Sequence, residues 1–118
     1  GGAISLHTFE GQILTIDLAK DRLFLESEQS FQARIADMKE LESRIARPGT
    51  GNVVDLFVAA NTPKGKIWML FDTGNFAPTH VSPAAMEMLG IDLIAPNKAK
   101  TVKPIDLDIV GLGSITAP

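Results

Sequence analysis

The sequence predicts a mainly β fold with one long and one short helix. Apolar runs of strand length recur along the chain, and turn residues such as Gly, Pro and Asp separate them. Helical spacing or a helix-start signal marks two other segments, residues 29–47 and 82–90. With 118 residues and 45% apolar content, the chain is expected to form one globular domain with a buried core.

The composition excludes several classes of function. The net charge is −3 with interspersed signs, so the chain has no basic stripe and we expect no nucleic-acid partner. The absence of cysteine excludes disulfides, thiol nucleophiles and thiolate metal sites within the chain. No apolar run has the length of a membrane span, and no signal peptide is visible. These features leave the compartment open.

The first third of the chain predicts a hairpin followed by the long helix. Residues 12–18 and 22–26 are apolar runs joined by a short turn, and Asp17 beside this turn is expected to be structural. The helix is expected to begin at Gln29 or Ser30 and to end before Pro48. Its apolar residues recur at steps of three and four, in the order Phe31, Ile35, Met38, Leu41 and Ile45. This stripe predicts either packing against the sheet or a bridge between two structural units.

The centre of the chain predicts a second hairpin that ends on a carboxylate. Residues 53–58 and 67–70 are apolar strands, and the second strand leads through Phe71 into Asp72-Thr73-Gly74. One interpretation is an Asx-type turn in which the glycine supplies an unusual backbone angle. The other is a functional carboxylate at the edge of the core, where desolvation and backbone N–H groups set its pKa.

The last third predicts the short helix and one more strand. Residues 82–90 begin with Ser-Pro, a good helix cap and first turn, and end at a glycine. Residues 101–110 alternate between apolar and polar side chains, and Pro104 within them predicts an edge strand. Gly111 and Gly113 end this strand.

The hairpin, the Asp-Thr-Gly turn and the Leu-Gly-Ile end of the short helix resemble the catalytic segment of retropepsin-like aspartic peptidases. Residues 4–25 resemble the closing segment of bacterial members, with Ser5 where that segment has glycine. The resemblance implies a closed antiparallel β-barrel or sandwich in which strands from both ends of the chain pair. It divides the chain into a closing segment at 1–28, a helix and linker at 29–50, and a catalytic segment at 51–118. Bacterial cytoplasm and periplasm are both compatible with it.

These segments occur in the reverse of the family's order, in which the Asp-Thr-Gly comes first. Two explanations fit this reversal: a piece cut from a protein with two tandem units, or a circularly permuted unit. The chain begins with Gly-Gly rather than Met and stops after Ser-Ile-Thr-Ala-Pro, which favours the first explanation slightly.

The resemblance implies a mechanism that needs two carboxylates sharing one proton. It assigns the catalytic role to Asp72 and the support of its loop to Thr73, Gly74 and Asn75, where Asn75 replaces the usual Ala or Ser. The second aspartate is expected from a second copy of the chain in a homodimer, or from a second protease-like unit.

Two function hypotheses follow. The first is a homodimeric aspartic endopeptidase that cleaves extended peptide or protein substrates; the second is a binding or assembly module that kept the fold without turnover. Gly111 and Gly113 are either the tip of a flap over the substrate or a plain loop. His7 and His80 have no neighbours at metal-ligand spacing, so we expect no metal and no cofactor.

Overall fold

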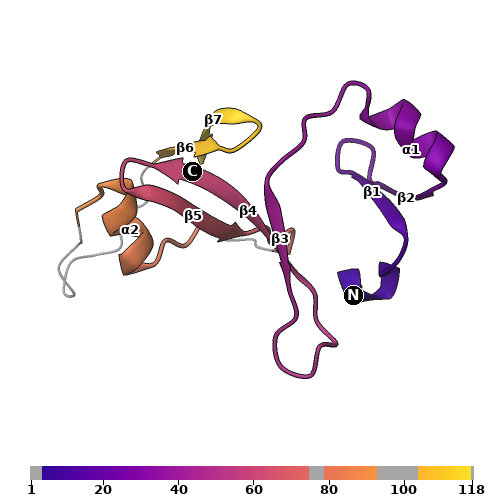
Figure 1. The fold of residues 1–118 in the computed structure, drawn as a ribbon, viewed down its shortest axis with the longest axis horizontal. Helices are drawn as coiled ribbons and strands as arrows, with labels where there is room; N and C mark the ends of the chain where they lie inside the picture. The colour runs from indigo at the N-terminus through magenta and orange to yellow at the C-terminus, as the bar shows by residue number, and fades with distance from the viewer. Residues whose placement is uncertain (1–3, 75–78, 93–103, 118) are drawn as a thin grey trace. The chain divides into compact units, whose positions relative to one another are not determined.

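A computed structural model describes residues 4–74, 79–92 and 104–117, and in these residues the chain is mainly β (Figure 1). Every strand pair with a defined register is antiparallel, as expected. The described strands form an open two-stranded sheet and an open five-stranded sheet, so the expected closed barrel is not found in this part of the chain.

The chain divides into two compact units rather than forming the single domain expected from its length. The N-terminal unit contains the residues up to Lys39 and Ala46–Asp55, and the C-terminal unit contains Glu40–Ile45 and the residues from Leu56 onward. The elements in chain order are η1 (Leu6–Phe9), β1 (Ile13–Asp17), β2 (Arg22–Glu26), α1 (Glu28–Ile35), β3 (Ser43–Ala46), β4 (Asp55–Thr62), β5 (Gly65–Leu70), α2 (Pro83–Leu89), β6 (Ile105–Ile109) and β7 (Gly113–Ala117).

The N-terminal unit contains the expected first hairpin. β1 pairs with β2 from Ile13 opposite Glu26 to Asp17 opposite Arg22. The side chain of Asp17 accepts a hydrogen bond from the Lys20 N–H at 3.1 Å, which is the structural role expected of a turn aspartate. These two strands pair only with each other within the described residues, so the expected pairing between strands from the two ends of the chain is not seen there.

The prediction of one long helix is wrong for the second half of that segment. α1 ends at Ile35, and residues that were expected to continue it form β3 instead. The backbone N–H of Glu42 donates to the carbonyl of Val110 at 3.5 Å, and the Glu42 carbonyl accepts from the Ala59 N–H at 3.0 Å. Because these strand contacts supply partners for the backbone, tertiary pairing overrides the good helix propensity of this segment.

The C-terminal unit is built on the five-stranded sheet. Its strands follow the order β3-β4-β6-β7, and β5 pairs with β4 from Phe57 opposite Leu70 to Thr62 opposite Gly65. The core of this unit is small: Ala60, Leu107 and Ile109 are buried and lie in one cluster. The partly buried residues packed around it are Leu41, Ile67, Met69, Leu89, Ile105 and Ala117.

The expectation that the strand after Pro104 lies at an edge is also wrong. β6 begins immediately after this proline and pairs with β7 along its whole length and with β4 at Ala60 and Asn61. Pro104 therefore lies just outside the ladder, where its missing N–H interrupts no strand pair. The alternation itself is confirmed, because Leu107 and Ile109 are buried whereas Asp106 and Asp108 are exposed.

The short helix α2 is confirmed with both of its ends. The side chain of Ser82 accepts a hydrogen bond from the Ala85 N–H at 3.2 Å, and Gly90 ends the helix with a φ of 71°. α2 lies beside β5 and contributes Leu89 to the packing of the core (Figure 1). The hydrophobic contacts of this helix therefore depend on a start that one serine hydroxyl stabilises.

Replacing Ser82 by alanine is expected to destabilise the C-terminal unit by about 1 kcal/mol, because the first turn of α2 loses its cap. Ser82→Asp is the matched control, since aspartate restores an acceptor at the same position. Urea unfolding followed by the fluorescence of Trp68 measures both variants. Equal stability of Ser82→Ala and Ser82→Asp would contradict a role for the cap.

No helix in the described ranges is long and apolar enough to cross a membrane.

Candidate functional site

The site begins with β5, which delivers Asp72 from an ordered sheet. The β4–β5 ladder extends one residue beyond the end of β5, because the Phe71 N–H donates to the Leu56 carbonyl at 2.8 Å. The backbone is therefore fixed immediately before the carboxylate, which emerges where the strand ends. Asp72, Thr73 and Gly74 are all exposed.

An Asx-type contact fixes the Asp72 carboxylate. Its Oδ1 accepts a hydrogen bond from the Gly74 N–H at 2.9 Å. Gly74 is not one of the residues with positive φ, so the expected unusual backbone angle is not present. A Cβ atom on Gly74 would lie 3.3 Å from the same Oδ1, so a side chain at this position would require the carboxylate to shift slightly.

Apolar side chains lie next to this carboxylate along the chain. Leu70 is 52% exposed and Phe71 is 51% exposed, although their backbone belongs to the ladder. Asn75, the fourth residue expected in the loop, lies outside the described residues. No hydrogen bond or ion pair joins Asp72 to a second carboxylate within the parts of the chain that the structure describes.

Gly111 and Gly113 lie at the turn between β6 and β7, which closes with a hydrogen bond from the Leu112 N–H to the Ile109 carbonyl at 3.0 Å. Their φ angles are 94° and 98°. The turn lies against the segment before β3: a Cβ on Gly111 would be 2.0 Å from the Glu40 carbonyl oxygen. A role for this turn as a flap over substrate stays a prediction.

Sequence reasoning missed a cluster that braces the strand before Asp72. The Arg44 guanidinium lies 3.9 Å from the centre of the Trp68 ring, and Lys66 forms an ion pair with Glu42. Lys66 and Trp68 belong to β5, whereas Arg44 belongs to β3 and Glu42 directly precedes it, so the two pairs lie on either side of β4. The sequence signal was the spacing of two in each pair, Glu42/Arg44 and Lys66/Trp68, which places both members on one face of an extended segment.

Neither histidine belongs to a group of potential metal ligands within the described residues. His7 Nδ1 lies 2.8 Å from Glu10 Oε2, and Arg47 also binds Glu10. The hydrogen bond from Arg47 is the largest cause that lowers the pKa of the Glu10 carboxyl below its usual value. His80 is exposed, and the described ranges contain no group of three or more His, Asp or Glu side chains that could hold a metal ion.

Comparison with known proteins found no matching family model, no matching curated protein and no matching solved structure. The resemblance to retropepsin-like peptidases therefore rests on the residues of this sequence.

Proposed function

We propose that this chain forms one half of a retropepsin-like aspartic endopeptidase, in which Asp72 supplies one of two catalytic carboxylates. The observation that carries this proposal is the position of Asp72: an exposed carboxylate at the end of an ordered strand, inside an Asp-Thr-Gly turn. The second carboxylate comes from Asp72 of a second copy, since a two-fold axis places identical loops face to face.

The chemistry requires that the two carboxylates share one proton. Like charges at such short range disfavour ionisation of both groups, so the pair holds one carboxylate and one carboxylic acid. The carboxylate takes a proton from a water molecule, whose oxygen attacks the peptide carbonyl carbon, and the acid donates its proton to the carbonyl oxygen. The C–N bond then breaks as the amide nitrogen takes up a proton, which releases an amine and a carboxylic acid.

The local geometry suits this role. The Gly74 N–H holds one oxygen of Asp72 in place, which leaves the other oxygen for water, substrate or the partner carboxylate. The absence of a side chain at Gly74 lets a second loop approach this carboxylate closely. The exposed side chains of Leu70 and Phe71 would exclude water around a pair of such loops once the two copies associate.

A non-catalytic binding or assembly module is the second candidate. The observation that favours it is the exposure of apolar side chains, in a chain whose sequence contains one Asp-Thr-Gly motif where the dyad needs two. Leu14 pairs with Leu25 and Ile16 pairs with Leu23 across the first hairpin, and Ile16, Leu23 and Leu25 are all exposed. Such a face is typical of surfaces that bind another protein segment, and it needs no chemistry at Asp72.

Cleavage of a mixed peptide library from acid to neutral pH tests the proposal. Asp72→Asn is expected to lower the cleavage rate by about 10²- to 10⁴-fold, the range that acid–base catalysis contributes. The variant keeps an oxygen that can accept from the Gly74 N–H, so it removes the charge and preserves the turn. Asp21→Asn is the matched control, because it makes the same chemical change at an exposed turn residue of the first hairpin.

The mass of the protein in solution is measured in the same samples. Cleavage that requires the dimer and disappears in Asp72→Asn but not in Asp21→Asn supports the aspartic pair. A folded protein that cleaves no peptide at any pH contradicts the enzyme and favours the binding module.

A further inference from the structure

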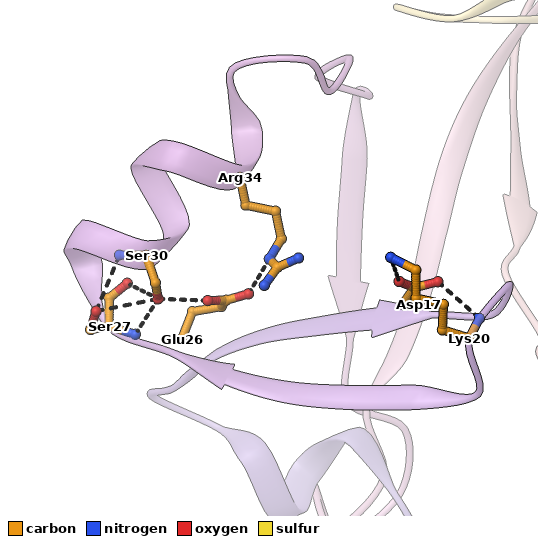
Figure 2. Close-up of polar contacts among 6 residues, drawn as sticks. All are labelled: Asp17, Lys20, Glu26, Ser27, Ser30 and Arg34. Atoms are coloured by element: carbon orange, nitrogen blue, oxygen red, sulfur yellow. Dashed lines mark hydrogen bonds and ion pairs between the residues drawn. The ribbon is translucent and has the colours of Figure 1, made fainter.

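The N-terminal unit contains a nearly buried carboxylate at the joint between β2 and α1. The side chain of Glu26 is 4% exposed, and it is the last residue of β2, two residues before the helix begins. The Ser30 hydroxyl donates to Glu26 Oε2 at 2.6 Å, and the Arg34 Nε donates to Oε1 (Figure 2). One carboxylate therefore receives donors from two successive turns of α1.

α1 buries only part of its surface in the described structure. Its half-buried residues are Ser30, Phe31, Arg34 and Ile35, which form one face of the helix, and none of them is fully buried. The Arg34 guanidinium also lies 4.7 Å from the centre of the Phe24 ring. Because Arg34 is held by both Glu26 and Phe24, the carboxylate is the charge that keeps this cation at the joint.

The other charged groups on these elements do not replace Glu26. On the hairpin, Asp17 and Arg22 lie opposite one another at the far end of the strands, and Lys20 Nζ lies 3.7 Å from Asp17 (Figure 2). On the helix, Glu28 accepts a hydrogen bond from Gln32 at 3.0 Å. Glu26 is thus the carboxylate that pairs with Arg34 within the described residues.

The pKa of Glu26 determines how pH changes the stability of this joint. The hydrogen bond from Ser30 is the largest cause that lowers the pKa of Glu26; burial raises this pKa, and donation from Arg34 and Thr15 lowers it further, with a net decrease. A carboxyl whose pKa is lower in the folded state contributes stability that is fully present above its unfolded pKa, about 4.3. This contribution is lost as the pH falls through the folded pKa.

We propose that Glu26 is a proton-sensitive clamp that docks α1 on the β1–β2 hairpin at neutral pH and releases the helix when it is protonated. Release frees the half-buried side chains of Phe24, Phe31 and Ile35, so acidification uncovers apolar surface on the N-terminal unit. The C-terminal unit has no part in the clamp, and the proposal is independent of Asp72.

An acid titration of the whole chain, followed by NMR, tests the Glu26 clamp. Backbone amide shifts and heteronuclear relaxation of residues 28–35 report the docking of α1, while Trp68 fluorescence reports the C-terminal unit in the same samples. In the wild type, α1 is expected to become mobile as the pH falls below the unfolded carboxyl pKa of about 4.3, before the Trp68 signal changes. Glu26→Gln is expected to have a mobile α1 already at pH 7.

The matched control is Glu10→Gln, which removes a carboxylate of lowered pKa from the same unit but away from α1. It is expected to keep α1 docked at pH 7 and to leave its acid release unchanged. Ser30→Ala, which removes the largest cause of the lowered pKa but keeps the charge of Glu26, is expected to move the release to higher pH. A docked α1 in Glu26→Gln at pH 7, or release only together with loss of the Trp68 signal, overturns the proposal.

Discussion

Replacing Gly111 by alanine is expected to be the most damaging single-methyl change in the C-terminal unit. The φ angle of 94° is one that side-chain-bearing residues rarely adopt, and the new Cβ would lie 2.0 Å from the Glu40 carbonyl oxygen. Backbone strain costs roughly 1–3 kcal/mol and overpacking a further 1–3 kcal/mol. The sum of roughly 2–6 kcal/mol is a large part of the stability of a small unit.

Gly113→Ala separates the two causes. Its φ of 98° is nearly the same, but nothing lies within 4 Å of a Cβ at this position. We therefore expect a loss of roughly 1–3 kcal/mol from strain alone. Urea unfolding monitored by Trp68 compares the two variants, because this residue lies in the same unit. Equal losses would show that the turn does not pack on Glu40 in solution.

Local signals in the sequence predicted the elements whose hydrogen bonds are local. The two hairpins and α2 are defined by turns and caps close to their own residues, and each was found where expected. The end of the long helix was not predictable in this way. Residues 36–42 contain good helix formers, but 36–37 form a turn, and Glu42 pairs with Ala59 and Val110, which are distant in sequence.

Strand positions within a sheet were equally hard to predict. A strand over residues 101–110 was expected at an edge, but β6 begins at Ile105 and lies between β4 and β7, and residues 101–103 lie outside the described residues. Alternation along a strand identifies its buried face but carries no information about its neighbours. The closed barrel was implied by the resemblance to retropepsin-like peptidases, whereas the described strands form two open sheets.

The position of Asp72 at the end of a strand could be predicted, but the side-chain contacts of that strand could not. Asp72 was identified from the strand and turn around it, and the structure places it at the end of that strand as an exposed, oriented carboxylate. The brace between Arg44 and Trp68 was missed, because it joins β5 to a segment that had been expected to be helical. Contacts across a sheet depend on pairing that residue spacing alone does not define.

Mixing wild-type chains with Asp72→Asn chains is expected to reduce the cleavage rate more steeply than the fraction of wild-type chains falls. A pair of carboxylates at a two-fold axis takes one from each chain, so activity follows the fraction of dimers that carry two wild-type chains. After full exchange in an equal mixture, about one quarter of the dimers are of this kind, and the rate per wild-type chain falls to about one half. Each substituted chain removes a whole site because the two groups act as a unit.

The dependence of the cleavage rate on the mixing ratio distinguishes one site shared by two chains from two independent sites. A centre that contained Asp72 of only one chain would show a rate per wild-type chain that does not change at any mixing ratio. Asp21→Asn chains serve as the matched partner, since they can complete the pair and should leave the rate per active dimer at its wild-type value. A quadratic fall with Asp72→Asn and none with Asp21→Asn therefore assigns both catalytic carboxylates to the same position in two copies, whereas a linear fall places the second acid on another residue of the same chain.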